Sequence, residues 1–301
     1  MTQPAMLDCA VVGAGPAGLT AAIYLARFRR SFQVIDAGAS RAAWIPRTRN
    51  LPGFPGGIAG KALLARIRQQ AELYDAPIRP GRVEGIRIEE EGFQLVCDGE
   101  PLRARKVILA TGVVDRTPDV PGLADAVATG RLHACPICDG YETIGRRVGV
   151  LGLDAHGARE ALFLTNWSDQ VCLIHLGPPD DLPDPLRSEL ATAGIDVLEG
   201  GVEGVVGRAR IDGLRLKGGE VRGFDCLYAA LGVTARNQLA VEAGAELDDS
   251  GRLVVDDHQQ TTVPGLYAAG DVVRGLNQIS TAEGEGAIAA THIHNTHRPG
   301  D

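Results

Sequence analysis

Cys135 and Cys138 are the one close pair among the six cysteines of this 301-residue chain. Two intervening residues bring the sulfurs within bonding reach across a single turn, so the pair can close a small disulfide ring and reopen it with little backbone movement. In a reducing compartment, a close cysteine pair is more often catalytic or metal-binding than part of a disulfide scaffold. The spacing therefore predicts a redox centre or a metal site.

Zinc is the metal alternative, because His133 extends the motif to His-x-Cys-x-x-Cys. A structural zinc ion needs four ligands, and the sequence offers no second cysteine pair, so redox chemistry is favoured. His292 and His294 fall on different faces of an expected helix, which disfavours a metal site there. The other cysteines lie in apolar, strand-like segments and are interpreted as small core residues: Cys9, Cys97, Cys172 and Cys226.

A glycine-rich turn near the N-terminus predicts a dinucleotide site. Residues 13–18 read Gly-Ala-Gly-Pro-Ala-Gly between an expected strand, 8–12, and an expected helix, 19–28. A Cβ on the first two glycines would block the tight turn or the approach of a pyrophosphate, and one on the third would separate helix from strand. Asp36 closes the next strand, where its carboxylate can accept a hydrogen bond from a ribose hydroxyl. The phosphates would lie at the positive end of the helix.

A second unit of the same kind follows. It comprises an expected strand, a glycine loop, a helix and a strand at residues 148–151, 152–157, 158–165 and 171–174. The segments VILATG and LYAALG, at 107–112 and 227–232, close the two units. The C-terminal part adds a strand ending in a carboxylate, 262–271, and a helix, 282–295.

We therefore predict an α/β fold with two Rossmann-like, three-layer domains of the dinucleotide-binding type. The second is inserted in the first: residues 1–118 and 245–301 form one domain, and residues 119–244 form the domain that carries the cysteine pair.

Composition excludes several functional classes. Hydrophobic residues make up 45% of the chain, and 30 basic against 38 acidic residues give a net charge of −8. A nucleic-acid binder needs a basic footprint, so we expect no nucleic-acid partner. The chain has no run of 18 apolar residues and its first nine residues lack a secretion signal, so we expect a soluble, cytoplasmic protein with no membrane partner.

Together these segments resemble the low-molecular-weight thioredoxin reductase family of FAD-dependent disulfide oxidoreductases, over almost the whole chain. The markers are GAGPAG (13–18), NLPGFP (50–55), ATG (110–112), CPICDG (135–140) and YAAGD (267–271). A CxxC pair inside the second domain separates this family from the glutathione reductase type.

The resemblance implies one FAD per chain, bound in the first domain. Asp36 would face the adenosine ribose, Asp271 the flavin side of the diphosphate linker or the ribityl chain, and Asn50 the ring. Gln278 and Ile279 would present backbone amides to the pyrimidine edge of the flavin. The FAD-binding residues implied in this way are Gly13, Gly15, Pro16, Ala17, Gly18, Asp36, Asn50, Ala110, Thr111, Gly112, Gly270, Asp271, Gln278 and Ile279.

The resemblance also assigns roles to the cysteine segment. Cys138 would lie nearer the flavin, Cys135 would attack the external disulfide, and Asp139 would exchange protons with the thiols. We expect a lowered thiolate pKa if Cys138 opens a helix or turn. The family further implies a homodimer and a thioredoxin-like protein, or a small dithiol or disulfide, as substrate.

The second glycine loop departs from the family's NADPH-binding pattern. Asp154 replaces its middle glycine, so a carboxylate stands where a pyrophosphate would approach. The family's His-Arg-Arg stretch for the 2′-phosphate is replaced by His-Leu-Gly-Pro-Pro-Asp-Asp at 175–181, in which His175 is interpreted as a solvated loop residue. We therefore expect that NADPH is not the efficient reductant.

The resulting hypothesis is an FAD-dependent thiol-disulfide oxidoreductase that reduces a protein disulfide with ferredoxin or an additional flavin as donor. Three alternatives stay open: a dithiol oxidase that forms disulfides in a small molecule with oxygen as acceptor, an NAD(P)H-dependent thioredoxin reductase with a divergent loop, and a non-enzymatic flavin redox sensor. Six arginines indicate either a local positive patch suited to an acidic electron carrier or a phosphate-bearing ligand, or an ordinary solvated surface around the first helix and its loop: Arg27, Arg29, Arg30, Arg41, Arg47 and Arg49. Trp44 could stack near a flavin or anchor its loop.

Overall fold

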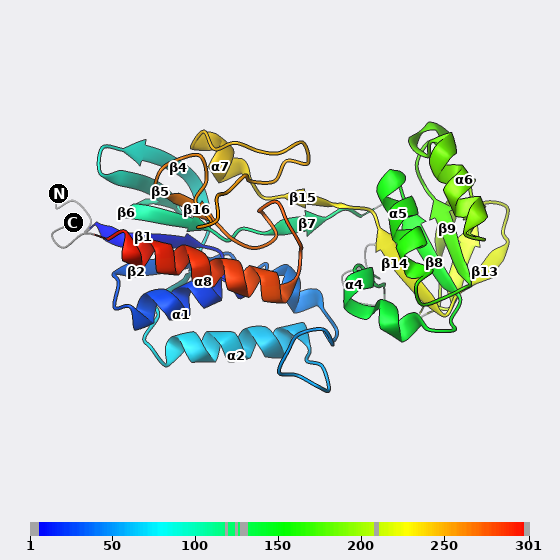
Figure 1. Cartoon of the computed structure of the whole chain (residues 1–301), viewed down its shortest axis with the longest axis horizontal. Coiled ribbons are helices and arrows are strands. Elements are labelled where there is room, and N and C mark those ends of the chain that lie inside the picture. The colour runs from blue at the N-terminus through cyan, green and yellow to red at the C-terminus, as the bar shows by residue number, and fades with distance from the viewer. Residues whose placement is uncertain (1–5, 118–119, 124–125, 127–131, 208–210, 298–301) are drawn as a thin grey trace.

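Buried apolar strands form the centre of each of two lobes in the computed structural model of the chain, which describes residues 6–117, 120–123, 126, 132–207 and 211–297 (Figure 1). The N-terminal and C-terminal parts of the chain build the first lobe, and the middle part builds the second. A two-stranded ribbon joins the lobes.

The first lobe contains twelve of the described elements. They are β1 (Leu7–Val12), α1 (Pro16–Arg27), β2 (Phe32–Asp36), the 3-10 helix η1 (Arg41–Trp44), α2 (Gly60–Glu72), β3 (Ile78–Pro80), β4 (Val83–Glu89), β5 (Gly92–Cys97), β6 (Glu100–Leu109), α7 (Gln238–Glu242), β16 (Leu266–Ala268) and α8 (Ile279–Asn295).

Seven strands of the first lobe form one sheet, in the order β3-β2-β1-β6-β5-β4, with β16 also paired to β6. The strands β1, β2, β3, β6 and β16 run parallel, and the β4–β5 hairpin runs antiparallel. Cys9 and Val11 of β1 pack with α1 and α8, whereas Ala10 and Val12 belong to the core on the opposite face. Because both faces are covered, the central strands are continuous apolar runs.

The second lobe repeats the parallel sheet on a smaller scale. Its elements are α4 (Pro136–Asp139), the 3-10 helix η2 (Gly140–Thr143), β8 (Val148–Gly152), α5 (Ala155–Leu164), β9 (Val171–His175), the 3-10 helix η3 (Pro179–Asp181), α6 (Asp184–Thr192), β10 (Asp196–Leu198), β11 (Val202–Val206), β12 (Gly213–Leu216), β13 (Val221–Gly223) and β14 (Cys226–Ala230).

Its four parallel strands lie in the order β10-β9-β8-β14, and β11-β12-β13 form a separate antiparallel sheet. Val148 and Val150 of β8 pack toward α5 and α6, and Leu151 packs toward the antiparallel sheet. The layered arrangement of helices, parallel sheet and antiparallel sheet confirms the predicted α/β fold with two Rossmann-like units.

The ribbon between the lobes consists of β7 (Val113–Asp115) and β15 (Val233–Ala235), which pair antiparallel. After β15 the chain is back in the first lobe, since Leu239 and Ala240 of α7 lie in its core. We therefore propose a boundary near Gly232 for the inserted lobe, in place of Gly244. The other expected boundary, at residues 118 and 119, lies outside the described residues.

Helices begin earlier than the sequence predicted. α1 begins at Pro16 because proline at the first helical position loses no hydrogen bond, and α5 and α8 begin at Ala155 and Ile279. The expected strand over 262–271 is limited to β16, since Gly265, with φ at +81°, turns the chain immediately before it. Among the described residues, no helix is both long and apolar enough to cross a membrane.

Candidate active site

A cavity of about 890 Å³ extends from the carboxyl ends of β1, β2, β6 and β16 to α4 of the second lobe. It brings together residues from both ends of the chain and from the cysteine segment. All but one of the residues predicted for the site line it: Gly13, Gly15, Pro16, Ala17, Asp36, Asn50, Ala110, Thr111, Gly112, Cys135, Cys138, Asp139, Gly270, Asp271, Gln278 and Ile279. Gly18 is the exception.

The three glycines of the first turn have different surroundings. A Cβ on Gly18 would stand 1.9 Å from the carbonyl oxygen of Gly13, and Gly13 itself has φ at +107°. Gly13 and Gly18 are therefore required by the turn itself. A Cβ on Gly15 would meet only the Ser40 hydroxyl, at 3.4 Å. Gly15 thus leaves open space at the amino end of α1, which carries no side-chain cap.

Asp36 ends β2 at the rim of the cavity, as predicted. Its Oδ1 accepts a hydrogen bond from the backbone N–H of Gly38 at 2.9 Å, and its Oδ2 pairs with the guanidinium of Arg68. Arg68 could not be predicted as its partner, because the two residues are 32 positions apart in the chain.

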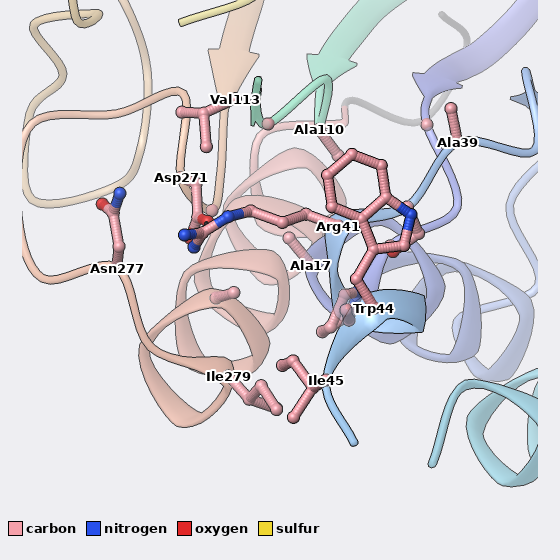
Figure 2. Close-up of a pocket in the computed structure, with 18 of the residues that line it drawn as sticks. Ala17, Ala39, Arg41, Trp44, Ile45, Ala110, Val113, Asp271, Asn277 and Ile279 are labelled. Atoms are coloured by element: carbon pink, nitrogen blue, oxygen red, sulfur yellow. Dashed lines mark hydrogen bonds and ion pairs between the residues drawn. The ribbon is translucent and has the colours of Figure 1, made fainter. Parts of the chain in front are cut away.

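Arg41 extends from η1 toward two carboxylates, those of Asp115 and Asp271, and Figure 2 shows its side chain directed at Asp271. Its guanidinium donates to both oxygens of Asp115, at 2.6 and 2.8 Å, and lies 3.5 Å from Asp271. Burial raises the pKa of Asp271, although the charge of Arg41 opposes this shift. Burial lowers the pKa of Arg41, but the hydrogen bond and charge of Asp115 outweigh it and the net shift is upward. The half-exposed Trp44 indole lies beside Arg41 on the cavity wall.

Three of the six arginines of the predicted positive patch, Arg41, Arg47 and Arg49, line the cavity. Five of the six also have partners of their own. Arg27 contacts Tyr74, Arg30 contacts His294, Arg41 lies in the cavity, Arg47 donates to the carbonyl of Gly56, and Arg49 pairs with Glu142 of the second lobe.

Cys135 and Cys138 are joined as a disulfide, with their Cα atoms 5.3 Å apart. Cys135 caps α4 and Cys138 lies inside this short helix, so it is not Cys138 that opens the helix. From the first lobe, Gln278 directs its side-chain Nε2 to both sulfurs, at 3.4 and 3.6 Å. The backbone N–H of Gln278, which the sequence placed toward a flavin edge, donates to the carbonyl of Leu276 at 2.9 Å.

Asp139 follows the disulfide directly and is held through both carboxylate oxygens. The buried Tyr228 hydroxyl donates to Oδ1 at 2.7 Å, and Nδ1 of His133 contacts Oδ2. Burial and the nearby Asp139 raise the pKa of Tyr228, so its hydroxyl keeps its proton and donates. From the sequence, His133 was interpreted only as a possible metal ligand. Tyr228 was not predicted to contact Asp139, because it lies in an apolar segment that is typical of a core strand.

The second glycine loop differs from the first in charge and in packing. Asp154 caps α5, its carboxylate accepting from the backbone N–H of His156 at 2.8 Å. His175, expected in solvent, is buried and its Nε2 lies 2.9 Å from the carbonyl oxygen of Pro178. A Cβ on Gly177 would stand 2.0 Å from the carbonyl oxygen of Leu153, so this position has no room for an arginine.

The other four cysteines are buried, in agreement with their interpretation as core residues. Burial raises the pKa of the Cys97 and Cys226 thiols, and raises that of Cys172 to about 11. In the described part of the chain, no group of three or more His, Cys, Asp or Glu side chains could hold a metal ion.

The cavity fits FAD, the cofactor that the resemblance implies. Its volume lies near the top of the usual range for ligand sites, about 300–1,000 Å³. Gly15 leaves room beside the free amides of α1, where a diphosphate would be stabilised. The disulfide lies in the wall of the same cavity, so a redox ring in the cavity would lie next to the sulfurs.

Residues 7–286 match the protein family described as pyridine nucleotide-disulphide oxidoreductase. Thioredoxin reductase of Mycolicibacterium smegmatis is 32% identical, over 96% of this chain and 96% of that protein. NADPH-dependent thioredoxin reductase 3 of Arabidopsis thaliana is 31% identical, over 93% of this chain and 56% of that protein. The solved structure of thioredoxin reductase from Streptococcus pyogenes is similar with a TM-score of 0.88 and 27% identity, over 97% of this chain and 98% of that one.

Proposed function

Because the chain belongs to the pyridine nucleotide-disulphide oxidoreductase family, as a thioredoxin reductase-like, FAD-dependent disulfide oxidoreductase, we propose that it reduces a protein disulfide through Cys135 and Cys138 with a donor other than NADPH. The substrate is a thioredoxin-like protein, in keeping with the names of its relatives. The donor is a reduced ferredoxin or an additional flavin.

The observation that carries the choice of donor is the Asp154 cap on α5. The carboxylate accepts from the N–H of His156 and so occupies the helix terminus at which a nucleotide diphosphate would bind. A second negative charge at this position is repelled. Asp180 and Asp181, in the exposed η3 turn, add further negative charge after the carboxyl end of β9, the parallel neighbour of β8.

The first lobe retains the features that a dinucleotide site needs. Gly15 and the amides of α1 would hold the diphosphate of FAD, Asp36 the adenosine ribose, and Asp271 the flavin side of the molecule. Bound FAD supplies the two-electron redox chemistry of the family. Asn50 and Gln278, in the cavity wall next to the disulfide, would flank the ring.

Within the cysteine segment, we propose that Asp139 exchanges protons with the thiols. Asp139 follows Cys138 in the short helix α4, and Tyr228 and His133 hold its two carboxylate oxygens in a fixed orientation. The leaving thiolate of an exchange reaction needs a proton, and Asp139 is adjacent to the cysteine in sequence.

The experiment is anaerobic mixing of the FAD-loaded protein with NADPH, NADH or reduced ferredoxin, followed through the flavin absorbance. We expect bleaching by reduced ferredoxin, with subsequent reduction of added thioredoxin, and little bleaching by either nicotinamide. A Cys135→Ser, Cys138→Ser double variant is the matched control, because it should still bleach but should not reduce thioredoxin. Rapid bleaching by NADPH at micromolar concentration would instead support a nicotinamide-dependent reductase.

A further inference from the structure

The side chain of Gln278 points its amide nitrogen at the disulfide from the opposite lobe. Nε2 lies 3.4 Å from Sγ of Cys135 and 3.6 Å from Sγ of Cys138, and Oε1 lies 3.7 Å from Sγ of Cys138. Asn50 lies behind it, with Nδ2 at 2.8 Å from Oε1 of Gln278. The nitrogen and oxygen of an amide look alike by shape, so their assignment must come from the surrounding partners.

Those partners fix the orientation. Nδ2 of Asn50 also lies 3.3 Å from the backbone carbonyl oxygen of Ile137, which can only accept. The Asn50 nitrogen must therefore face Ile137, and its oxygen faces the hydroxyl of Thr48, at 2.9 Å. The same nitrogen donates to Oε1 of Gln278. The NH₂ group of Gln278 is then the part of the amide nearest to the disulfide, and Sγ of Cys135 is the sulfur closest to it.

We propose that Gln278 is a catalytic residue of the disulfide couple, whose N–H stabilises the thiolate formed on reduction, and that Asn50 is the positioning residue that orients it. Reduction breaks the bond between the two sulfurs, takes up two electrons and one proton, and leaves one thiol and one thiolate. A charged thiolate accepts a hydrogen bond more strongly than a disulfide sulfur does. The donor therefore favours the reduced pair.

This stabilisation sets the redox poise of the pair, because a couple whose reduced form is stabilised has a higher reduction potential. Without the donor, the Cys135–Cys138 disulfide should be harder to reduce. The inference rests on the proposed role of the pair as a redox centre. It does not depend on the identity of the electron donor or of the protein substrate.

The test is equilibration of the FAD-loaded protein with mixtures of reduced and oxidised dithiothreitol, followed by alkylation of free thiols and mass spectrometry. Reduced dithiothreitol gives two electrons and one proton to the pair, releases its second proton to the solvent, and closes its own disulfide ring. We expect Gln278→Leu to lower the equilibrium constant for reduction of the pair about tenfold, a shift of about 30 mV.

Two further variants test whether the N–H group of Gln278, and not the packing of its side chain, sets the equilibrium constant for reduction of the disulfide. Gln278→Glu keeps the shape but offers no N–H in its ionised form, so it should shift the equilibrium at least as far as leucine. Asn50→Asp removes the donor to Oε1 and lets the Gln278 amide turn its oxygen to the sulfurs, so it should shift the equilibrium in the same direction with Gln278 still present. Leu276→Ala, at an exposed position in the same loop, is the control and should leave the midpoint unchanged.

Unchanged midpoints in Gln278→Leu and Asn50→Asp, in protein that melts like the wild type, would overturn the inference. If dithiothreitol never opens the disulfide in the wild type, the proposed redox function itself fails. The two failures are therefore distinguishable in one assay.

Discussion

The hydroxyl of Tyr228 donates a hydrogen bond to Oδ1 of Asp139 at 2.7 Å, from a strand 89 residues further along the chain. Tyr228 is fully buried in the second lobe, whereas Asp139 lines the cavity. This hydrogen bond therefore anchors the Asp139 carboxylate, next to the disulfide, to the sheet of the second lobe. His133 contacts Oδ2 of Asp139, so both carboxylate oxygens have partners in this arrangement of the site.

Tyr228→Phe should lower thiol–disulfide turnover about tenfold or more. The substitution leaves Oδ1 without its donor, and a hydrogen bond to a charged group contributes about 1.5–3 kcal/mol, while about 1.4 kcal/mol in a barrier corresponds to a factor of ten in rate. The measurement is the steady-state rate of thioredoxin reduction. Tyr141→Phe, at an exposed position next to the same segment, is the matched control. Wild-type turnover in Tyr228→Phe would remove Tyr228 from the proton-transfer scheme.

Gly15→Asp and Gly18→Ala should fail for different reasons. Gly15 has open space around it, so Gly15→Asp should fold but bind no FAD, because its carboxylate repels the diphosphate. At Gly18 a Cβ would collide with the Gly13 carbonyl oxygen, so Gly18→Ala should lose about 1–3 kcal/mol of stability. Flavin absorbance after loading and the melting temperature of the FAD-free proteins separate the two effects. A Gly15→Asp variant saturated with FAD would contradict the site.

Much of this site could be predicted from local sequence, and the rest depends on pairings that local sequence does not encode. Glycine spacing and the cysteine motif pointed to the first glycine turn, Asp36 and the disulfide, and the resemblance to a known family supplied the other predicted residues that line the cavity. The sequence missed Arg68 beside Asp36, Arg41 beside Asp115, and Tyr228 beside Asp139, because these contacts join residues that are 32, 74 and 89 positions apart. The arginines of the expected patch likewise found separate partners once the chain folded.

Arg41→Gln should destabilise the protein in a pH-dependent way. Burial raises the folded-state pKa of Asp271, so the folded state loses stability as pH rises through that pKa, and Arg41 is the cation that opposes the loss. The deficit of the variant should therefore be largest at neutral pH, about 1–3 kcal/mol, and should shrink on acidification as Asp271 is protonated.

Urea unfolding at neutral and acidic pH measures this effect. Adding Asp271→Asn to the Arg41→Gln variant should recover part of the lost stability, because the buried charge is removed. An equal deficit at both pH values would show that Arg41 acts through packing alone.

Only two thiols should react with iodoacetamide in the reduced, folded protein. Cys135 and Cys138 line the cavity, whereas the other four cysteines are buried. Burial also raises the pKa of thiols such as Cys172, which lowers the fraction of reactive thiolate. Mass spectrometry should give two labels after mild reduction and six after unfolding, the number of cysteines in the chain. Additional rapid labelling in the native protein would mean that the core of a lobe becomes exposed more often than the structure indicates.

Asp154→Gly combined with Leu176→Arg should improve reduction of the FAD-loaded protein by NADPH. At an effective dielectric near 20, two unit charges about 4 Å apart repel by roughly 4 kcal/mol, so removing the Asp154 carboxylate frees the amino end of α5 for a diphosphate. Leu176 follows β9 directly, packs against the core of the second lobe and is partly exposed, and an arginine there would add positive charge next to this loop. Gly177 must stay, because a Cβ there would collide with the Leu153 carbonyl oxygen.

Stopped-flow bleaching of the flavin in this double variant should therefore become faster with NADPH and not with reduced ferredoxin. Asp181→Asn, in the exposed η3 turn, controls for a general loss of negative charge and should give a much smaller gain. If the unmodified protein is already reduced by micromolar NADPH as fast as the double variant, the Asp154 cap does not determine the donor.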